Sequence, residues 1–248
     1  MVDQIRMHPG ARPMRPEAQG GIPRRSNRDG GIPSLVVHEL RTPLTAIHGY
    51  TQLIERNPAN QAAVMRASGV ILQETRRLAE LLNHLSEVAE LDADLVTHQP
   101  VVTDVVGVVR DVVDRARRRS GLHALAVLND GPVVGRCDPR RLGQLLSHLV
   151  ANAICYAPDG GRVPISVGRC HNEVHITVFD PGLGIAPEEH ERVYERYFRG
   201  QSATRTGVRG LGLGLYLARE VAARCGGRVW HEPGDNGGTV FHLVLPDA

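Results

Sequence analysis

The strongest constraint on the fold is a pair of apolar stripes in the first half of the chain. From Ser34 to Ile54, apolar residues recur at mixed three- and four-residue spacings, which is typical of one face of a helix. A second stripe runs from about Asn60 to Leu91. Asn57-Pro58 separates the two, because the residue before a proline disfavours helical geometry. Ser34 can cap the first helix with its hydroxyl. The sequence therefore predicts an antiparallel helical hairpin.

An isolated hairpin cannot bury both sides of stripes this broad. Pairing with a second copy would cover the remaining apolar surface and give a four-helix bundle. We therefore expect the hairpin to be the dimerisation element of a homodimer.

The 33 residues before the hairpin predict a disordered tail. They contain five prolines, several glycines and six arginines, and they lack the apolar run of a signal peptide. No run of eighteen apolar residues occurs, so no membrane span is expected. The net charge of +2 gives no electrostatic case for binding nucleic acid. All 29 basic residues are arginines, which excludes mechanisms that require a lysine.

From residue 95 onwards the pattern predicts mixed helices and strands. Runs of both types without regular βαβ alternation favour an α+β sandwich. The expected strands are Val101–Val102, Leu125–Leu128, Val163–Gly168, Glu173–Phe179, Arg228–His231 and Thr239–Leu245, and the expected helices end near Arg115–Arg119 or span about Pro139–Tyr156 and Leu211–Cys225. A further helical piece is expected within Gly182–Gly210. The predicted domains are thus a tail (1–33), a hairpin (34–94) and a sandwich (95–248).

A candidate nucleophile lies near the start of the first helix. The imidazole of His38 offers a free lone pair at neutral pH. Glu39 beside it can accept the other ring N–H and take up a proton. Thr42 lies one turn further on the same face, where its hydroxyl can hold an attacking water. Pro43 cannot donate to the carbonyl of Glu39, so a bend is expected there.

The second half contains the parts of a nucleotide site. On the predicted helix that spans about Pro139–Tyr156, the amide oxygen of Asn152 can ligate Mg²⁺. The carboxylate of Asp180, at a strand end, can accept from an adenine amino group, and Gly182 and Gly184 allow a tight turn behind it. The glycine-rich run Gly210–Leu215 leads into a helix whose free N–H groups suit phosphate. Each of these features alone is weak evidence.

Taken together, the segments resemble the two-component histidine kinases. His38–Leu44 reads HELRTPL and is similar to the H-box of that family over seven consecutive residues. Arg76–Ser86 resembles its second dimerisation helix. In the sandwich, the resemblances are a stretch leading into the N-box helix (Cys137–Leu142), the N-box (Gln144–Ala153), the first glycine box (Asp180–Ile185), the F-box of the lid (Val193–Arg199), the second glycine box (Gly210–Leu215) and the last glycine box (Gly237–Thr239).

The resemblance covers about residues 34–248 and implies a hairpin dimerisation domain followed by a Bergerat-type ATP-binding sandwich. It implies that ATP phosphorylates His38 with help from Glu39, and that an aspartate of a response regulator then receives the phosphoryl group. It also implies that Thr42 supports dephosphorylation of the regulator. The site residues it implies are Asn152 for Mg²⁺; Tyr156, Asp180, Gly182 and Gly184 for adenine; and Gly210, Gly212, Gly214 and Thr239 of the glycine boxes.

Three departures from the family pattern stand out. His148 occupies the position of an N-box asparagine, on the same helix face as Asn152, and Cys155 replaces a basic residue next to Tyr156. The helix before His38 is short, because Pro33 and two glycines precede it. The sensor is therefore expected to be missing, to lie on a separate chain, or to be replaced by the tail. A cytoplasmic kinase core is the resulting prediction.

Two other functions remain open at this level. One is an ATPase of the same superfamily, of the gyrase, chaperone or mismatch-repair type, although those enzymes use an N-box glutamate where His148 stands. The other is a degenerate kinase that binds ATP and docks a partner without efficient autophosphorylation.

Overall fold

A computed structural model describes residues 33–246 except residues 96, 130, 202, 204–206 and 236. The predicted tail, apart from Pro33, lies outside the described residues. Within the described part of the chain, no helix is both long enough and apolar enough to cross a membrane.

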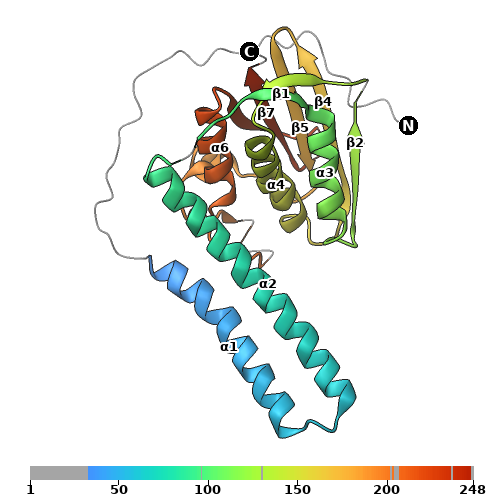
Figure 1. The fold of residues 1–248 in the computed structure, drawn as a ribbon, viewed down its shortest axis with the longest axis vertical. Helices are drawn as coiled ribbons and strands as arrows, with labels where there is room; N and C mark the ends of the chain where they lie inside the picture. Colours follow the sequence, from blue (N-terminus) through green and yellow to red (C-terminus); the bar gives the residue numbers. More distant parts are fainter. Residues whose placement is uncertain are drawn as a thin grey trace. The chain divides into compact units, whose positions relative to one another are not determined.

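The predicted hairpin is confirmed. Helices α1 (Ser34–Arg56) and α2 (Gln61–Asp92) run antiparallel and pack along their length (Figure 1). The side chain of Asn60 accepts a hydrogen bond from the N–H of Ala63 and caps α2. The expected cap at Ser34 is wrong, because Pro33 takes the N-cap position and no side chain caps α1. Pro43 is buried inside α1, and the helix continues past it to Arg56.

The rest of the described chain is an α+β sandwich, as predicted. A five-stranded sheet has the order β2-β4-β5-β7-β6, in which only β2 and β4 run parallel. Its strands are β2 (His123–Leu128), β4 (Gly161–Cys170), β5 (Glu173–Asp180), β6 (Arg228–Pro233) and β7 (Thr239–Pro246). Helices α3 (Val105–Arg117), α4 (Pro139–Cys155) and α6 (Gly214–Arg224) cover one face of the sheet (Figure 1).

The structure corrects three details of the sequence-based assignment. Strand β3 (Val134–Cys137), which pairs with β1 (Val101–Asp104) in a small second sheet, was not expected. Helix α6 begins at Gly214 and not near Leu211, since Gly212 adopts a φ of 63° that interrupts helical geometry. In the long loop, the expected helical structure includes two 3₁₀ turns, η1 (Pro187–Glu189) and η2 (Arg192–Tyr194), and the described residues Gln201 and Ala203 are α-helical.

The core fills the space between the sheet and its helices. Alternate residues of β5 face this core, which leaves its last residue, Asp180, buried as well. Leu81, Val88 and Leu91 of α2 belong to the same apolar cluster as the sandwich. Apolar packing is therefore continuous between the hairpin and the sandwich. The domain boundary between residues 94 and 95 stays a prediction.

Leu145 of α4 offers a direct test of this core, because its side chain is fully buried. We expect Leu145→Ala to lower the free energy of unfolding by about 2–5 kcal/mol, through lost transfer energy and the cavity it leaves. Leu122→Ala, at a position that is 73% exposed, should change it by less than about 0.5 kcal/mol. Urea unfolding followed by circular dichroism measures both, and equal losses would contradict this assignment of the core.

Candidate functional site

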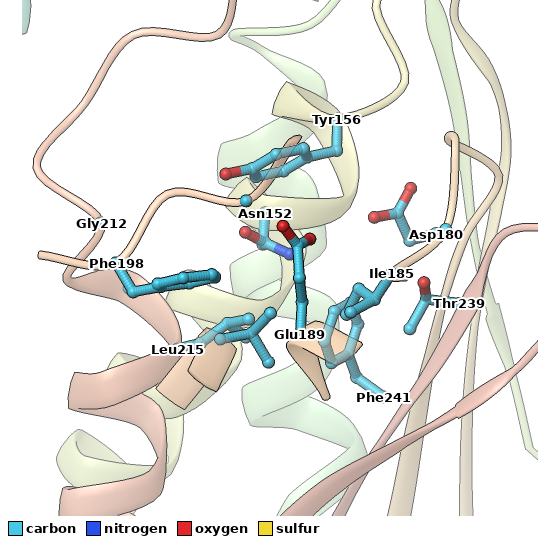
Figure 2. Close-up of a pocket in the computed structure, with 14 residues that line it drawn as sticks. Asn152, Tyr156, Asp180, Ile185, Glu189, Phe198, Gly212, Leu215, Thr239 and Phe241 are labelled. Carbon is cyan, nitrogen blue, oxygen red and sulfur yellow. The ribbon is translucent and has the colours of Figure 1, made fainter. Parts of the chain in front are cut away.

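A pocket lies where the end of β5, the start of β7, the C-terminal half of α4 and the start of α6 come together (Figure 2). The long loop between β5 and α6 supplies the remaining wall. The residues that line it are Asn152, Tyr156, Asp180, Gly184, Ile185, Glu189, Val193, Phe198, Gly200, Gly212, Gly214, Leu215, Thr239 and Phe241.

The structure brings most of the predicted nucleotide residues into this pocket. Those that line it are Asn152, Tyr156, Asp180, Gly184, Gly212, Gly214 and Thr239. Gly182 and Gly210 do not line it, and their expected roles in ligand binding stay predictions. Gly182 instead donates its N–H to Asp180 at 2.8 Å, and a Cβ there would lie 2.2 Å from the carbonyl oxygen of Tyr156. Gly182 is thus needed for close packing behind the pocket.

Asp180 is the most perturbed acid of the pocket. Its residue is 4% exposed, and burial raises the pKa of its carboxyl group to about 6, despite the hydrogen bond from the N–H of Gly182. A carboxylate has about four acceptor sites, so beside the bond from Gly182 it has acceptor capacity left for a ligand. The alternation of β5 therefore buries Asp180 and leaves its carboxylate able to accept a hydrogen bond from a ligand.

Helix α4 supplies the opposite wall. Asp138 caps the helix by accepting from the N–H groups of Arg140 and Arg141, and a row of buried leucines fixes the rotation of the helix. This rotation turns Asn152 toward the pocket (Figure 2). Tyr156, the C-cap of α4, lies beside it, and burial raises the pKa of its hydroxyl group.

Several lining residues were not predicted as ligand contacts. Glu189 is buried in η1, and its Oε1 accepts from the N–H of Gln201 at 2.9 Å. Ile185, Leu215 and Phe241 give the pocket apolar walls suited to a planar ring. The contribution of Phe198 could have been anticipated from the F-box resemblance. Glu189 lies in a loop with no periodic signal, so no sequence pattern pointed to it.

The candidate nucleophile is exposed on α1 and does not line the pocket. The expected pairing of Glu39 with the ring of His38 is not what the structure shows. Glu39 is buried and lies 2.8 Å from Arg77 of α2 and 3.6 Å from Arg199. Successive helical residues point about 100° apart, so Glu39 faces α2 while His38 faces outward. Arg199 follows Phe198, and it therefore connects the pocket rim to the first turns of α1.

Thr42 also differs from expectation. Its hydroxyl donates to the carbonyl oxygen of His38 at 3.1 Å, within the helix. This bond occupies the proton that an attacking water would otherwise accept, although the oxygen keeps its lone pairs.

The two departures from the family pattern in α4 lie outside the pocket. His148 is one turn before Asn152, but its ring contacts α2 at Glu87 instead of lining the pocket. Although they share a face of α4, His148 contacts α2 and Asn152 lines the pocket. Cys155 is exposed and does not line the pocket either.

Comparison with known proteins gives two family matches. Residues 34–94 match the model for the His Kinase A (phospho-acceptor) domain. Residues 137–248 match the model for the histidine kinase-, DNA gyrase B- and HSP90-like ATPases. Together the two matches cover most of the described chain, in the order that the fold shows.

Individual relatives agree with these matches. The sensor-like histidine kinase SenX3 of Mycobacterium tuberculosis is 36% identical over 217 residues, covering 85% of this chain and 52% of the relative. The solved structure of the mycobacterial sensor histidine kinase MprB is 30% identical, covers 60% of this chain and 97% of its own, and has a TM-score of 0.52. Histidine kinase ThkA, solved in complex with response regulator protein TrrA, shares the fold at 22% identity, with a TM-score of 0.66 over 86% of this chain and 60% of its own.

The chain spans about half the length of SenX3 and smaller shares of other curated relatives. The sensor histidine kinase WalK of Bacillus subtilis, 30% identical over 216 residues, is covered to 35% of its length and 85% of this chain.

The raised pKa of Asp180 makes stability depend on pH. A carboxyl whose folded pKa lies above its unfolded value favours the native state below the unfolded pKa, and this advantage is lost as pH rises through the folded pKa. Between about pH 4 and pH 7, ionisation of Asp180 should cost the folded protein roughly 2–3 kcal/mol. Asp180→Asn, which cannot ionise, should therefore match the natural protein near pH 4 and be more stable at pH 7. Urea unfolding at both pH values measures this, and an advantage independent of pH would contradict it.

Proposed function

The chain belongs to the sensor histidine kinases, and from this premise we propose that it is an autokinase that transfers the γ-phosphoryl group of ATP to His38. The observation that carries the proposal is the combination of an exposed histidine on α1, within a matched phospho-acceptor domain, and a pocket formed by a matched ATPase domain. The proposed domains are 34–94 for dimerisation and phosphotransfer and 95–248 for ATP binding.

The pocket suits an adenine nucleotide. In its ionised form, Asp180 can accept a hydrogen bond from the adenine amino group, and the hydroxyl of Thr239 lies on the same side (Figure 2). Tyr156 and the apolar walls can pack against the faces of the base. Gly212 and Gly214 precede or open α6, whose first N–H groups are unsatisfied within the helix and favour the phosphates.

The pocket also fits Mg²⁺ bound to nucleotide. Among the residues that the structure describes, no cluster of three or more histidines, cysteines or acids could hold a metal ion. Mg²⁺ needs no such cluster, because it is commonly held by one or two protein oxygens together with substrate phosphates. The amide of Asn152 and the carboxylate of Glu189, both in the pocket, are such oxygens. When bound, the ion neutralises charge on the phosphates.

In the proposed reaction, a ring nitrogen of His38 attacks the γ-phosphorus in line and ADP leaves with the bond electrons. The proton of the other ring nitrogen is then free to pass to a base or to solvent. For Glu39 to take it, its carboxylate must first leave Arg77 and Arg199, which now neutralise it. Glu39 would therefore act only after a rearrangement of this ion pair.

The phosphoryl group would next pass from phosphohistidine to an aspartate of a response regulator. ThkA has been solved with such a partner, and the shared fold supports an equivalent surface on this chain. Thr42, next to His38 on the helix, is proposed to assist in dephosphorylating the regulator once its hydroxyl leaves the His38 carbonyl. Because ATP and the response regulator are cytoplasmic substrates, we place this kinase core in the cytoplasm. Its signal would come from a separate segment or chain.

The hairpin is proposed to form a homodimer. Large apolar side chains remain exposed on both helices, and several of them are seven residues apart. They are Val37, Leu44 and Leu53 of α1 and Met65, Leu72 and Leu82 of α2. A second copy would bury this surface in a four-helix bundle.

Autophosphorylation tests the proposed activity. Incubation with γ-labelled ATP and Mg²⁺ should give acid-labile label on the protein, because phosphohistidine hydrolyses in acid. His38→Gln should abolish the label while leaving nucleotide affinity within about twofold, since His38 lies outside the pocket. His48→Gln, at an exposed histidine later in the same helix, is the matched control and should retain the label. Nucleotide binding without label would indicate a degenerate kinase, and steady phosphate release without label would indicate an ATPase.

Dimerisation can be tested at one position. Leu72→Glu should shift the protein from dimer to monomer in analytical ultracentrifugation, because two buried carboxylates in the bundle would be unpaired. Val102→Glu, which alters an 80% exposed residue of β1, should not change the sedimentation coefficient. A natural protein that sediments as a monomer at micromolar concentration would refute the homodimer.

A further inference from the structure

His148 makes a specific contact between the sandwich and the hairpin. It is 7% exposed on α4, and its Nε2 lies 2.8 Å from Oε2 of Glu87 in α2. Its ring centroid lies 5.3 Å from that of His84, at an interplanar angle of 50°. Since His84 and Glu87 are three residues apart on α2, they share a face, and one side chain of α4 engages both.

Two more residues of α4 extend this contact. The amide of Gln144 helps to lower the pKa of the Glu87 carboxyl group, and Arg141 donates from Nη1 to Oε1 of Gln144 at 3.0 Å. Residues 141, 144 and 148 are spaced by three and four, so they lie along one face of the helix. A continuous polar stripe of α4 thus converges on one carboxylate of α2.

The pKa values of Glu87 and His84 indicate their charges near neutral pH. Burial alone would raise the pKa of Glu87, but hydrogen bonds from His148 and Gln144 hold its pKa below the usual value. Glu87 is therefore ionised. Burial, with a smaller effect from His148, lowers the pKa of His84 to about 4, so His84 is neutral and acts as a packing partner.

These hydrogen bonds contribute more to the orientation of the sandwich on α2 than to the strength of its attachment. Leu81, Val88 and Leu91 of α2 already join the apolar cluster of the sandwich, but apolar contact is non-directional. Beside the Glu87 contact lies an open groove of about 600 Å³, lined partly by Glu87 and Gln144. Close packing is absent on that side, so the directional hydrogen bonds of Glu87 restrict the rotation of α4 over α2.

The two helices joined by the contact of His148 with Glu87 also contact the two sites of the proposed reaction. Asn152, one turn beyond His148 on α4, lines the nucleotide pocket. Arg77, on α2, binds Glu39, the residue next to His38. We propose that His148 is a positioning residue for phosphoryl transfer, which acts through Glu87 and His84 to fix the orientation of the nucleotide-binding sandwich over the hairpin that carries His38. The inference rests on the proposed kinase activity.

The test compares autophosphorylation rate with nucleotide affinity. At saturating ATP, Glu87→Ala and His148→Ala should each slow the labelling of His38 by about tenfold, the order expected for loss of a hydrogen bond to a charged group. The dissociation constant for ATP should stay within about twofold. Because both changes remove one interaction, the double variant should be no slower than the slower single variant. Glu87→Gln keeps an acceptor oxygen and should restore most of the rate.

Glu90→Ala is the matched control. Its carboxylate lies on the same helix, approaches Arg141 only to 4.0 Å and is 44% exposed, so its removal should change the rate by less than about twofold. Hydrogen exchange supplies a readout that does not need catalysis. Amides in 84–91 and 141–149 should exchange faster in Glu87→Ala, while β5 and β7 keep their protection.

The outcomes separate the two proposals. If the natural protein acquires no label, the proposed function fails. If the natural protein is labelled but Glu87→Ala and His148→Ala are equally fast or faster, or lose nucleotide affinity in proportion to rate, the positioning role is overturned. Loss of folding in His148→Ala would leave the decision with Glu87→Ala, whose altered side chain is partly exposed.

Discussion

Helix α2 has to satisfy two partners at once, and the arrangement of the whole described chain depends on this. One side packs along α1, and the C-terminal half also contributes Leu81, Val88 and Leu91 to the core of the sandwich. The apolar stripe of α2 therefore serves both partners. The polar groups between them, Glu39 with Arg77 on one side and Glu87 with His148 on the other, are correspondingly specific. Hydrophobic burial holds the parts together, and these bonds determine their orientation.

Much of the fold could be predicted from the sequence, for physical reasons that are visible in particular elements. The period of the apolar residues predicted α1, α2 and α4 closely, and strict alternation predicted the β4–β5 hairpin. Strand β3 escaped because four residues carry too little alternation to stand out, and its pairing with β1 is a long-range choice. The start of α6 was misplaced because periodicity cannot reveal the positive φ of Gly212.

Site residues could be predicted where a local sequence motif contains them. They could not be predicted where their role depends on the direction in which the side chain points. Asn152, Asp180 and the glycines that line the pocket come from segments whose order and spacing are distinctive. Glu39 was expected to pair with the ring of His38. Because adjacent residues of a helix point in different directions, its carboxylate instead forms ion pairs with Arg77 and Arg199 from distant segments. Gly182 and Gly210 lie in the right loops without lining the pocket. Glu189 enters through a 3₁₀ turn that only tertiary structure can position.

The buried carboxylate of Asp180 has a consequence for the lifetime of the protein. An acid that is ionised against its preference is a weak point of the ligand-free fold, and a bound donor removes part of that weakness. Ligand that binds only the folded state adds stability in proportion to the logarithm of its concentration. Unfolded molecules are the ones that cellular proteases degrade. A donor bound in the pocket beside Asp180 would therefore lower the fraction of unfolded chain on which proteases act.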